Sequence, residues 1–139
     1  MRVTHLTLAL VIGTAGALAA QDTTAQARPA AVPALTVEAI LTRGVVDRVP
    51  QDTATAFPPD VGQLVLWTKV SGGSPGQTIH HVWFHGDNQV ADIELPVNGS
   101  PWRTWSRKTV PAEWTGAWHV EVRDAAGTVL KRIDFTAGQ

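Results

Sequence analysis

From Leu35 onward, apolar and polar residues alternate in short segments. This period of two predicts β-strands, because successive side chains of a strand point to opposite faces of the sheet. The sequence contains no apolar pattern of period 3.6 that is long enough for an amphipathic helix. We expect strands at residues 35–41 with a continuation to 46, and at 64–70, 78–85, 89–97, 102–110, 117–123 and 128–135.

Segments rich in Gly, Pro, Asn and Asp separate these strands at 57–60, 71–76, 98–101 and 124–127. Such residues preset or tolerate the backbone dihedrals of turns. About seven strands in roughly 100 residues predict an all-β domain, an immunoglobulin-like β-sandwich of antiparallel strands. After the turn at Gly116, the alternation predicts that Trp118, Val120 and Val122 point into the core.

The N-terminal segment has a different pattern. An apolar run from Leu6 to Ala20 follows Arg2, and Ala17-Leu18-Ala19 fits the small-residue rule for signal peptidase. We expect a signal peptide at 1–19, a disordered tether at 20–34 and the folded domain at 35–139. A retained anchor is the weaker alternative, because a bilayer span needs roughly 20 apolar residues. The protein is therefore expected in the bacterial periplasm or outside the cell, with no membrane span after cleavage.

The composition of the chain limits the classes of partner that it can bind and the chemistry that it can carry out. Eleven basic and twelve acidic side chains give a net charge of −1, which argues against nucleic acid or an anionic membrane as partner. The absence of cysteine excludes disulfides and thiolate metal sites. Adjacent His80 and His81 point to opposite faces of one strand, so we expect neither a metal nor another cofactor. The sequence carries no Gly-x-Ser-x-Gly or comparable catalytic motif, and we expect no enzyme activity.

The segment 78–97 predicts a hairpin with a candidate site. If residues 87–88 form a two-residue turn, Trp83 opposes Asp92 and His81 opposes Glu94 on the face away from the core. A one-residue bulge would turn the apolar set toward water, so the even register is expected. The alternative is that Trp83 is buried under a second apolar layer, because large indoles in small domains are mostly buried.

The segment 102–108 contributes cationic and hydroxyl side chains beside two indoles, one on each face of the strand. An Arg stacked on an indole would be a stabilising cation–π contact. Together, the two segments give a hypothetical ligand-binding set of His81, Trp83, Asp92, Glu94, Arg103, Ser106 and Lys108.

Three strings carry a family resemblance: His-Val-Trp at 81–83, Trp-Arg-Thr-Trp-Ser-Arg-Lys at 102–108, and Trp-Thr-Gly-Ala-Trp at 114–118 with Val120 and Val122. They resemble an uncharacterised bacterial family of secreted or envelope-tethered domains, over residues 36–135. The resemblance implies a small β-sandwich in the cell envelope. It supplies no activity, ligand or catalytic residue.

These observations predict a non-catalytic binding module that recognises a glycan or an envelope protein through a strand face with Trp, His and carboxylate side chains. A structural or accessory envelope domain without a small-molecule ligand is the alternative. A glycan-acting enzyme with Asp92 and Glu94 as paired carboxylates comes third. The sequence specifies no oligomeric state.

Overall fold

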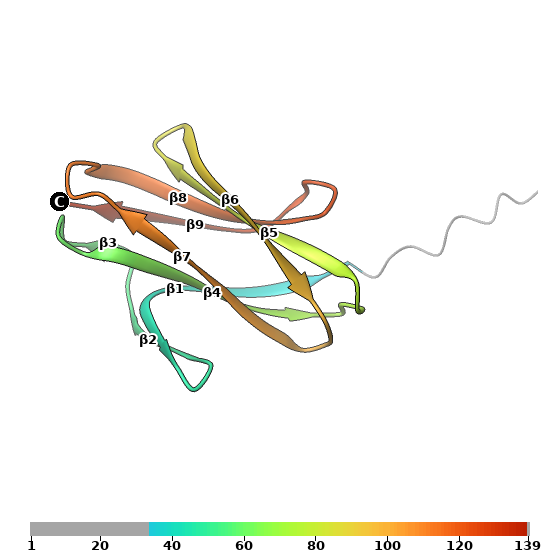
Figure 1. Cartoon of the computed structure of the whole chain (residues 1–139). Coiled ribbons are helices and arrows are strands. Elements are labelled where there is room, and N and C mark those ends of the chain that lie inside the picture. Colours follow the sequence, from blue (N-terminus) through green and yellow to red (C-terminus); the bar gives the residue numbers. More distant parts are fainter. Residues whose placement is uncertain (1–33, 139) are drawn as a thin grey trace, which may run out of the picture. The chain divides into compact units, whose positions relative to one another are not determined.

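The computed structural model describes residues 34–138, so the expected signal peptide at 1–19 and nearly all of the expected tether lie outside the described residues. The described chain consists of strands joined by turns (Figure 1). The strands are β1 (Thr36–Val46), β2 (Val49–Thr53), β3 (Ala56–Phe57), β4 (Gly62–Ser71), β5 (Gln77–His85), β6 (Asn88–Val97), β7 (Trp102–Val110), β8 (Gly116–Asp124) and β9 (Val129–Ala137).

These strands form two sheets. One sheet has the order β2-β1-β4-β7 and the other has the order β3-β9-β8-β5-β6. Neighbouring strands are antiparallel except β3 and β9, which are parallel. The predicted immunoglobulin-like β-sandwich is confirmed, with nine described strands instead of about seven. The short strands β2 and β3 were not predicted, because neither Val-Pro-Gln-Asp-Thr nor Ala-Phe carries an alternating apolar pattern.

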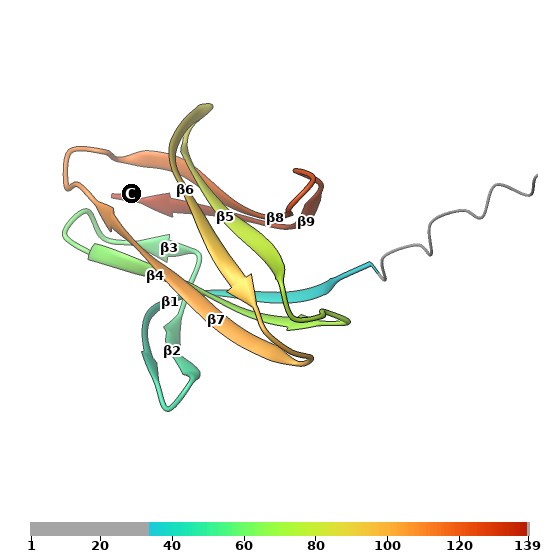
Figure 2. The same ribbon diagram turned by 45° about the vertical axis from the view of Figure 1, so that its right-hand side comes forward.

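A hairpin of β1 and β2 projects away from the sandwich (Figures 1 and 2). β1 pairs with β4 up to Thr42 and then continues with β2. Asp47 and Arg48 have φ angles of 50° and 64°, the left-handed pair that matches the twist of a two-residue hairpin turn. The flanking Val46 and Val49 are 59% and 54% exposed. The hairpin thus presents two apolar side chains at its tip.

The core lies between the inner faces of the two sheets. As predicted, Trp118, Val120 and Val122 of β8 are buried in it. Phe135 of β9 packs against Trp118 in a stacked arrangement, with ring centroids 5.8 Å apart. The rest of the buried apolar cluster is Leu41, Phe57, Leu64, Leu66, Val70, Ile79, Trp83, Val97, Val110 and Ala137.

The predicted register of the β5–β6 hairpin is wrong. The turn is centred on residues 86–87, with His85 paired to Asn88, and the pairing shifts between Trp83 and Phe84. This shift leaves Val90 as an extra residue in β6, so that Trp83 opposes Ala91. Because side chains alternate with a period of two, the one-residue bulge exchanges the faces of β5 relative to β6.

Candidate functional site

The structure places three of the predicted site residues in the core. Trp83, His81 and Ser106 are buried between the sheets, and the side chains of Trp83 and His81 are completely inaccessible. The expectation that Trp83 and His81 lie on the outer face is therefore wrong. The bulge turns them inward, where burial of a large indole gains more free energy than burial of the smaller outer-face side chains.

His81 connects the two sheets through hydrogen bonds. The hydroxyl of Thr68 donates to the carbonyl of Thr104 at 2.9 Å, so its oxygen must accept from His81 Nε2, 3.3 Å away. His81 Nδ1, 2.7 Å from Ser106 Oγ, then accepts from the serine hydroxyl. This arrangement uses the neutral imidazole. Burial lowers the pKa of His81 from 6.5 to about 3, which keeps the ring neutral at physiological pH.

Trp83 has a packing role. Its ring meets Phe135 edge to face, with centroids 6.2 Å apart. Its indole nitrogen is buried and has no hydrogen-bond partner among the described residues. A side chain in this position contributes to stability and cannot stack on a ligand.

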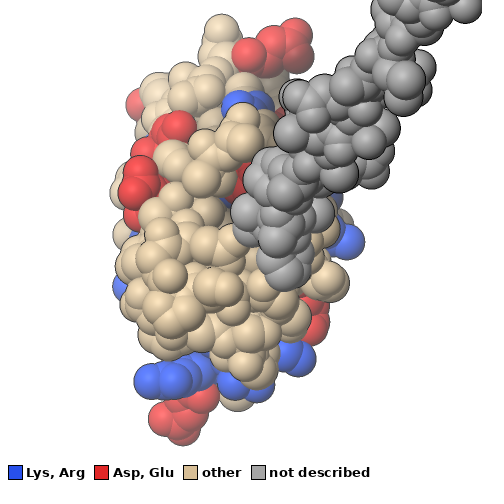
Figure 3. All heavy atoms as spheres, turned by 90° about the vertical axis from the view of Figure 1, so that its right-hand side faces the viewer, with Lys and Arg blue, Asp and Glu red and all other residues tan. Residues whose placement is uncertain are grey.

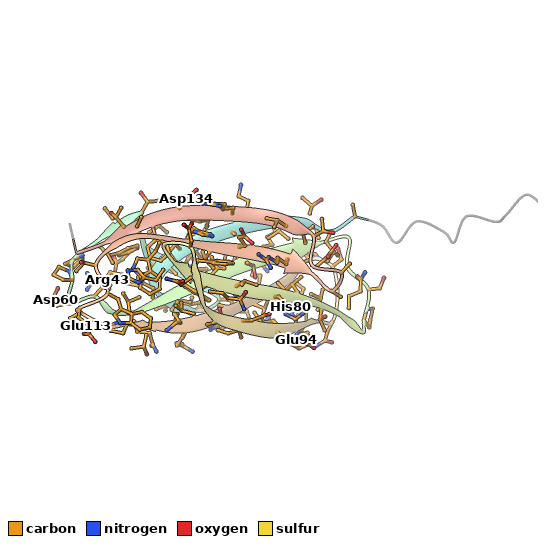
Figure 4. The ribbon with its side chains drawn as sticks, turned by 90° about the horizontal axis from the view of Figure 1, so that it is seen from above. Arg43, Asp60, His80, Glu94, Glu113 and Asp134 are labelled. Atoms are coloured by element: carbon orange, nitrogen blue, oxygen red, sulfur yellow. The ribbon has the colours of Figure 1, made fainter. Side chains whose placement is uncertain are left out.

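Asp92 and Glu94 lie on the outer face of the five-stranded sheet, as predicted, but with a different histidine. His80 Nδ1 donates to Asp92 Oδ1 at 2.7 Å, and His80 Nε2 is 3.8 Å from Glu94 Oε2. In Figure 4 the labelled His80 and Glu94 lie near each other on the face that contains Asp134 of β9. His80 takes the place that the sequence assigned to His81.

Glu121 is the centre of a second charged group on this face. Its side chain is 10% exposed and accepts a hydrogen bond from Arg123 Nε at 2.7 Å. Arg132 and His119 approach its other oxygen at 3.9 Å and 3.8 Å. Arg132 also binds Asp134, and this hydrogen bond lowers the pKa of Asp134 and raises the pKa of Arg132. The charges of this face are largely paired with one another.

An aromatic pair lies beside these charges. The rings of Phe84 and His119 are stacked with centroids 4.3 Å apart, and Arg123 lies over Phe84 at 5.6 Å. Desolvation, followed by the charge of Arg132, lowers the pKa of His119, against the opposite effect of Glu121 and the other nearby carboxylates. The lowered pKa favours the neutral form of the stacked imidazole.

Between the two charged groups the face is hollowed to about 230 Å³. The exposed Ala125 and Ala126 contribute apolar methyl groups to the lining, and His80, Asp92 and Arg123 contribute polar groups. The turn at 124–127 closes one side. Asp124 Oδ1 fixes this turn by accepting from the amides of Ala126 and Thr128 at 2.9 and 2.8 Å. Donors and acceptors thus lie beside small apolar side chains.

The remaining predicted residues lie elsewhere. Arg103 is opposite Lys69 on the outer face of the four-stranded sheet. Lys108 is over the ring of Trp114 at 5.7 Å, a cation–π contact, and donates to the carbonyl of Thr109. The seven predicted residues therefore do not form one site. They divide among the core, both outer faces and the Lys108–Trp114 contact.

Sequence reasoning missed His80, Arg123 and Glu121. A usable signal was present in β8, because the inward positions of Trp118 and Val120 require His119 and Glu121 to point outward. In the part of the chain that the structure describes, no group of three or more His, Asp or Glu residues has the arrangement of a metal site. The same residues include no helix with the length and apolarity to cross a bilayer.

The matched family covers the strands that carry this face. Residues 76–137 match the family described as "Protein of unknown function (DUF2914)". The expected resemblance to an uncharacterised family is confirmed. The DUF2914 region extends from β5 to β9 and contains all three strings on which the resemblance rests. Since His81, Trp83 and Ser106 of these strings are buried, that part of the motif reflects packing of the fold.

No curated protein matches the chain. Among solved structures, the β-glucosidase of Listeria innocua in complex with glucose or isofagomine is similar over 77% of this chain and 16% of its own, with 8% identity and a TM-score of 0.44. The GH3 β-glucosidase of Bifidobacterium adolescentis is similar over 76% of this chain and 17% of its own, with 5% identity and a TM-score of 0.41. The chain spans about a sixth of the length of these structures.

Proposed function

We propose that this protein is a non-catalytic recognition module that binds a neutral glycan through the outer face of β5, β6 and β8. The observation that carries the proposal is the hollow of about 230 Å³ in which His80, Asp92 and Arg123 lie beside Ala125 and Ala126. Sugars present both hydroxyl groups and C–H surfaces, so a site needs mixed donors and acceptors around an apolar patch.

A neutral ligand suits this face better than a charged one. Asp92 accepts a hydrogen bond from His80 and Glu121 accepts one from Arg123, so these charged groups are already engaged within the protein. Each bonded pair still has lone pairs or N–H groups that a hydroxyl can engage, because a hydroxyl both donates and accepts. The phenyl ring of Phe84 lies under Arg123 and stacks on His119, so both side chains are held in place before a ligand arrives.

The absence of catalysis is part of the proposal. The side chains of Asp92 and Glu94 are 46% and 65% exposed. A glycosidase needs a carboxylic acid in an enclosed, apolar setting that keeps it protonated. These two residues lack such a setting, and both are turned toward the same histidine. A binding role therefore fits them better than acid–base chemistry.

The N-terminal pattern supports a periplasmic or secreted location, where cell-wall glycans are accessible. The test is isothermal titration calorimetry of the full chain with chito-oligosaccharides and β-glucan oligosaccharides, which are neutral, and with soluble peptidoglycan fragments, which carry carboxyl groups. We expect binding to one class, with at least a tenfold loss in Asp92→Asn, since a buried polar contact contributes about 1.5 kcal/mol or more. Glu38→Gln on the opposite sheet is the control and should bind as the wild type does.

The structural or accessory role is the second candidate, because the same paired charges would also serve as a solvated surface without any ligand. It predicts that no glycan of the three classes binds and that Asp92→Asn changes only stability. Turnover of a glycan that is lost in both Asp92→Asn and Glu94→Gln would instead establish an enzyme.

A further inference from the structure

The outer face of the four-stranded sheet differs in its unpaired cations from the outer face of β5, β6 and β8, where we propose that the glycan binds. Along β7, Arg103, Trp105 and Arg107 alternate on this face and oppose Lys69, Trp67 and Val65 of β4. Lys69 pairs with Glu38 at 3.8 Å, whereas Arg103 and Arg107 form no ion pair with any described residue. Both arginines are exposed. In Figure 3, Lys and Arg side chains lie at the lower end of the molecule, with acidic side chains near them.

The projecting hairpin extends this cationic surface. The carbonyl of Arg48 accepts a hydrogen bond from the indole of Trp67 at 2.9 Å, which ties the hairpin to the sheet. Between them is a hollow of about 270 Å³. The side chain of Arg48 is exposed and likewise forms no ion pair within the described residues. The hollow is lined by Glu38, Ile40, Arg48, Val49, Pro50, Trp67, Lys69 and Arg103, so three of its side chains are cationic and one is anionic.

β7 also has a free edge. In the described sheet its only hydrogen-bonded neighbour is β4, so one side of this nine-residue strand has no partner strand. An edge strand offers its backbone groups to any extended chain of matching side chains. A second copy of the same edge is disfavoured, because Arg103, Arg107 and Lys108 would meet like charges. The cationic side chains of β7 therefore favour an acidic partner chain at this edge.

We propose that the free edge of β7, with Arg103 and Arg107 beside it and the cationic hollow behind it, binds an extended acidic peptide segment of a partner protein by strand addition. Acidic side chains on one face of the added strand would meet the arginines, and its backbone would continue the sheet. An acidic polysaccharide fits less well. A polysaccharide has no row of backbone N–H and C=O groups that could continue the sheet beyond β7.

The test is fluorescence anisotropy of the full chain with a labelled nine-residue peptide of alternating Glu and Val, the length of β7. We expect saturable binding that weakens as the salt concentration rises from about 0.05 M to about 0.5 M. The peptide of alternating Lys and Val should not bind. A peptide in which one central Val and the adjacent Glu are both replaced by Pro, with one Glu added at its end to keep the charge, should bind at least tenfold more weakly. One of the two Pro residues must then face β7, where it has no N–H to donate.

The matched variants are the double substitution R103E/R107E, which should lower the affinity at least tenfold, and Lys131→Glu on the other sheet, which should leave it unchanged. Thermal melts of each variant establish that it is folded. Equal binding of the Pro peptide would overturn strand addition, and unchanged affinity in R103E/R107E would overturn the site. Binding of polygalacturonate without binding of the Glu–Val peptide would assign the surface to an acidic polysaccharide. These results are separate from the glycan titrations, which concern the other face.

Discussion

The two outer faces of the sandwich differ in whether their charged side chains form ion pairs. On the five-stranded sheet, Glu121 has Arg123, Arg132 and His119 around it, and each of these arginines has an acidic partner. On the four-stranded sheet, Arg103 and Arg107 have no acidic partner among the described residues. A net charge of −1 for the whole chain conceals this difference. Local pairing, and not the total charge, indicates which face suits an anionic partner.

The two faces also differ in what their charged side chains contribute to the stability of the fold and to the binding of a partner. Paired, partly buried charges contribute to the fold, and in the proposed function they present fixed donors and acceptors to a neutral ligand. Exposed unpaired cations contribute little to the fold and retain their interaction free energy for a partner. Substitutions should therefore have effects on unfolding free energy that decrease from the core to the five-stranded face and then to the four-stranded face.

Substitutions in the core should cause the largest losses of unfolding free energy. Trp83→Ala should lower the free energy of unfolding by about 3–5 kcal/mol, because a buried indole is replaced by a cavity. Trp105→Ala is the matched control on the outer face and should cost much less, since Trp105 is only partly buried. Chemical denaturation followed by circular dichroism measures both. Equal losses would contradict the different positions of the two indoles.

Low pH should destabilise the fold through protonation of His81. Its folded pKa is lowered to about 3, so the unfolded chain binds the proton more readily and stability falls as the pH drops below 6.5. Between pH 6.5 and about pH 4 the loss is roughly 3 kcal/mol. Denaturation curves at several pH values should show this slope in the wild type and a shallower slope in His81→Gln. Identical slopes would place the acid sensitivity in other groups.

On the five-stranded face, Glu121→Gln should cost about 1–2 kcal/mol, because it leaves Arg123 and Arg132 with a weaker acceptor in a partly buried site. The conservative comparison on the four-stranded face is Glu38→Gln, whose exposed pair with Lys69 should contribute less than about 0.5 kcal/mol. Thermal melts of both variants at the same ionic strength test the ranking. A larger loss in Glu38→Gln would reverse the comparison.

The smallest effect is expected for the unpaired arginines. R103S/R107S should change the free energy of unfolding by no more than about 0.5 kcal/mol, since neither guanidinium has an acidic partner to lose. Circular dichroism melts measure the change, with Arg123→Ser as the control that should be clearly destabilised. A marked loss in R103S/R107S would mean that these arginines support the fold.

The sequence by itself determined the all-β class, the alternation in β8 and the outward position of Asp92 and Glu94. These features depend on local periodicity, which is a property of consecutive residues. The inward position of Trp118 followed from the same rule. Local periodicity did not predict the short strands β2 and β3, because their positions depend on pairing with β1 and β9.

Only the tertiary structure decided which face of β5 is buried. Both faces of that strand carry an aromatic side chain, so alternation alone leaves the choice open. One extra residue at Val90 settled it, moving Trp83 and His81 into the core and leaving His80 beside Asp92. The pairing of Glu121 and the isolation of Arg103 were likewise decided by the sheets, because ion pairing depends on distances between strands far apart in the sequence.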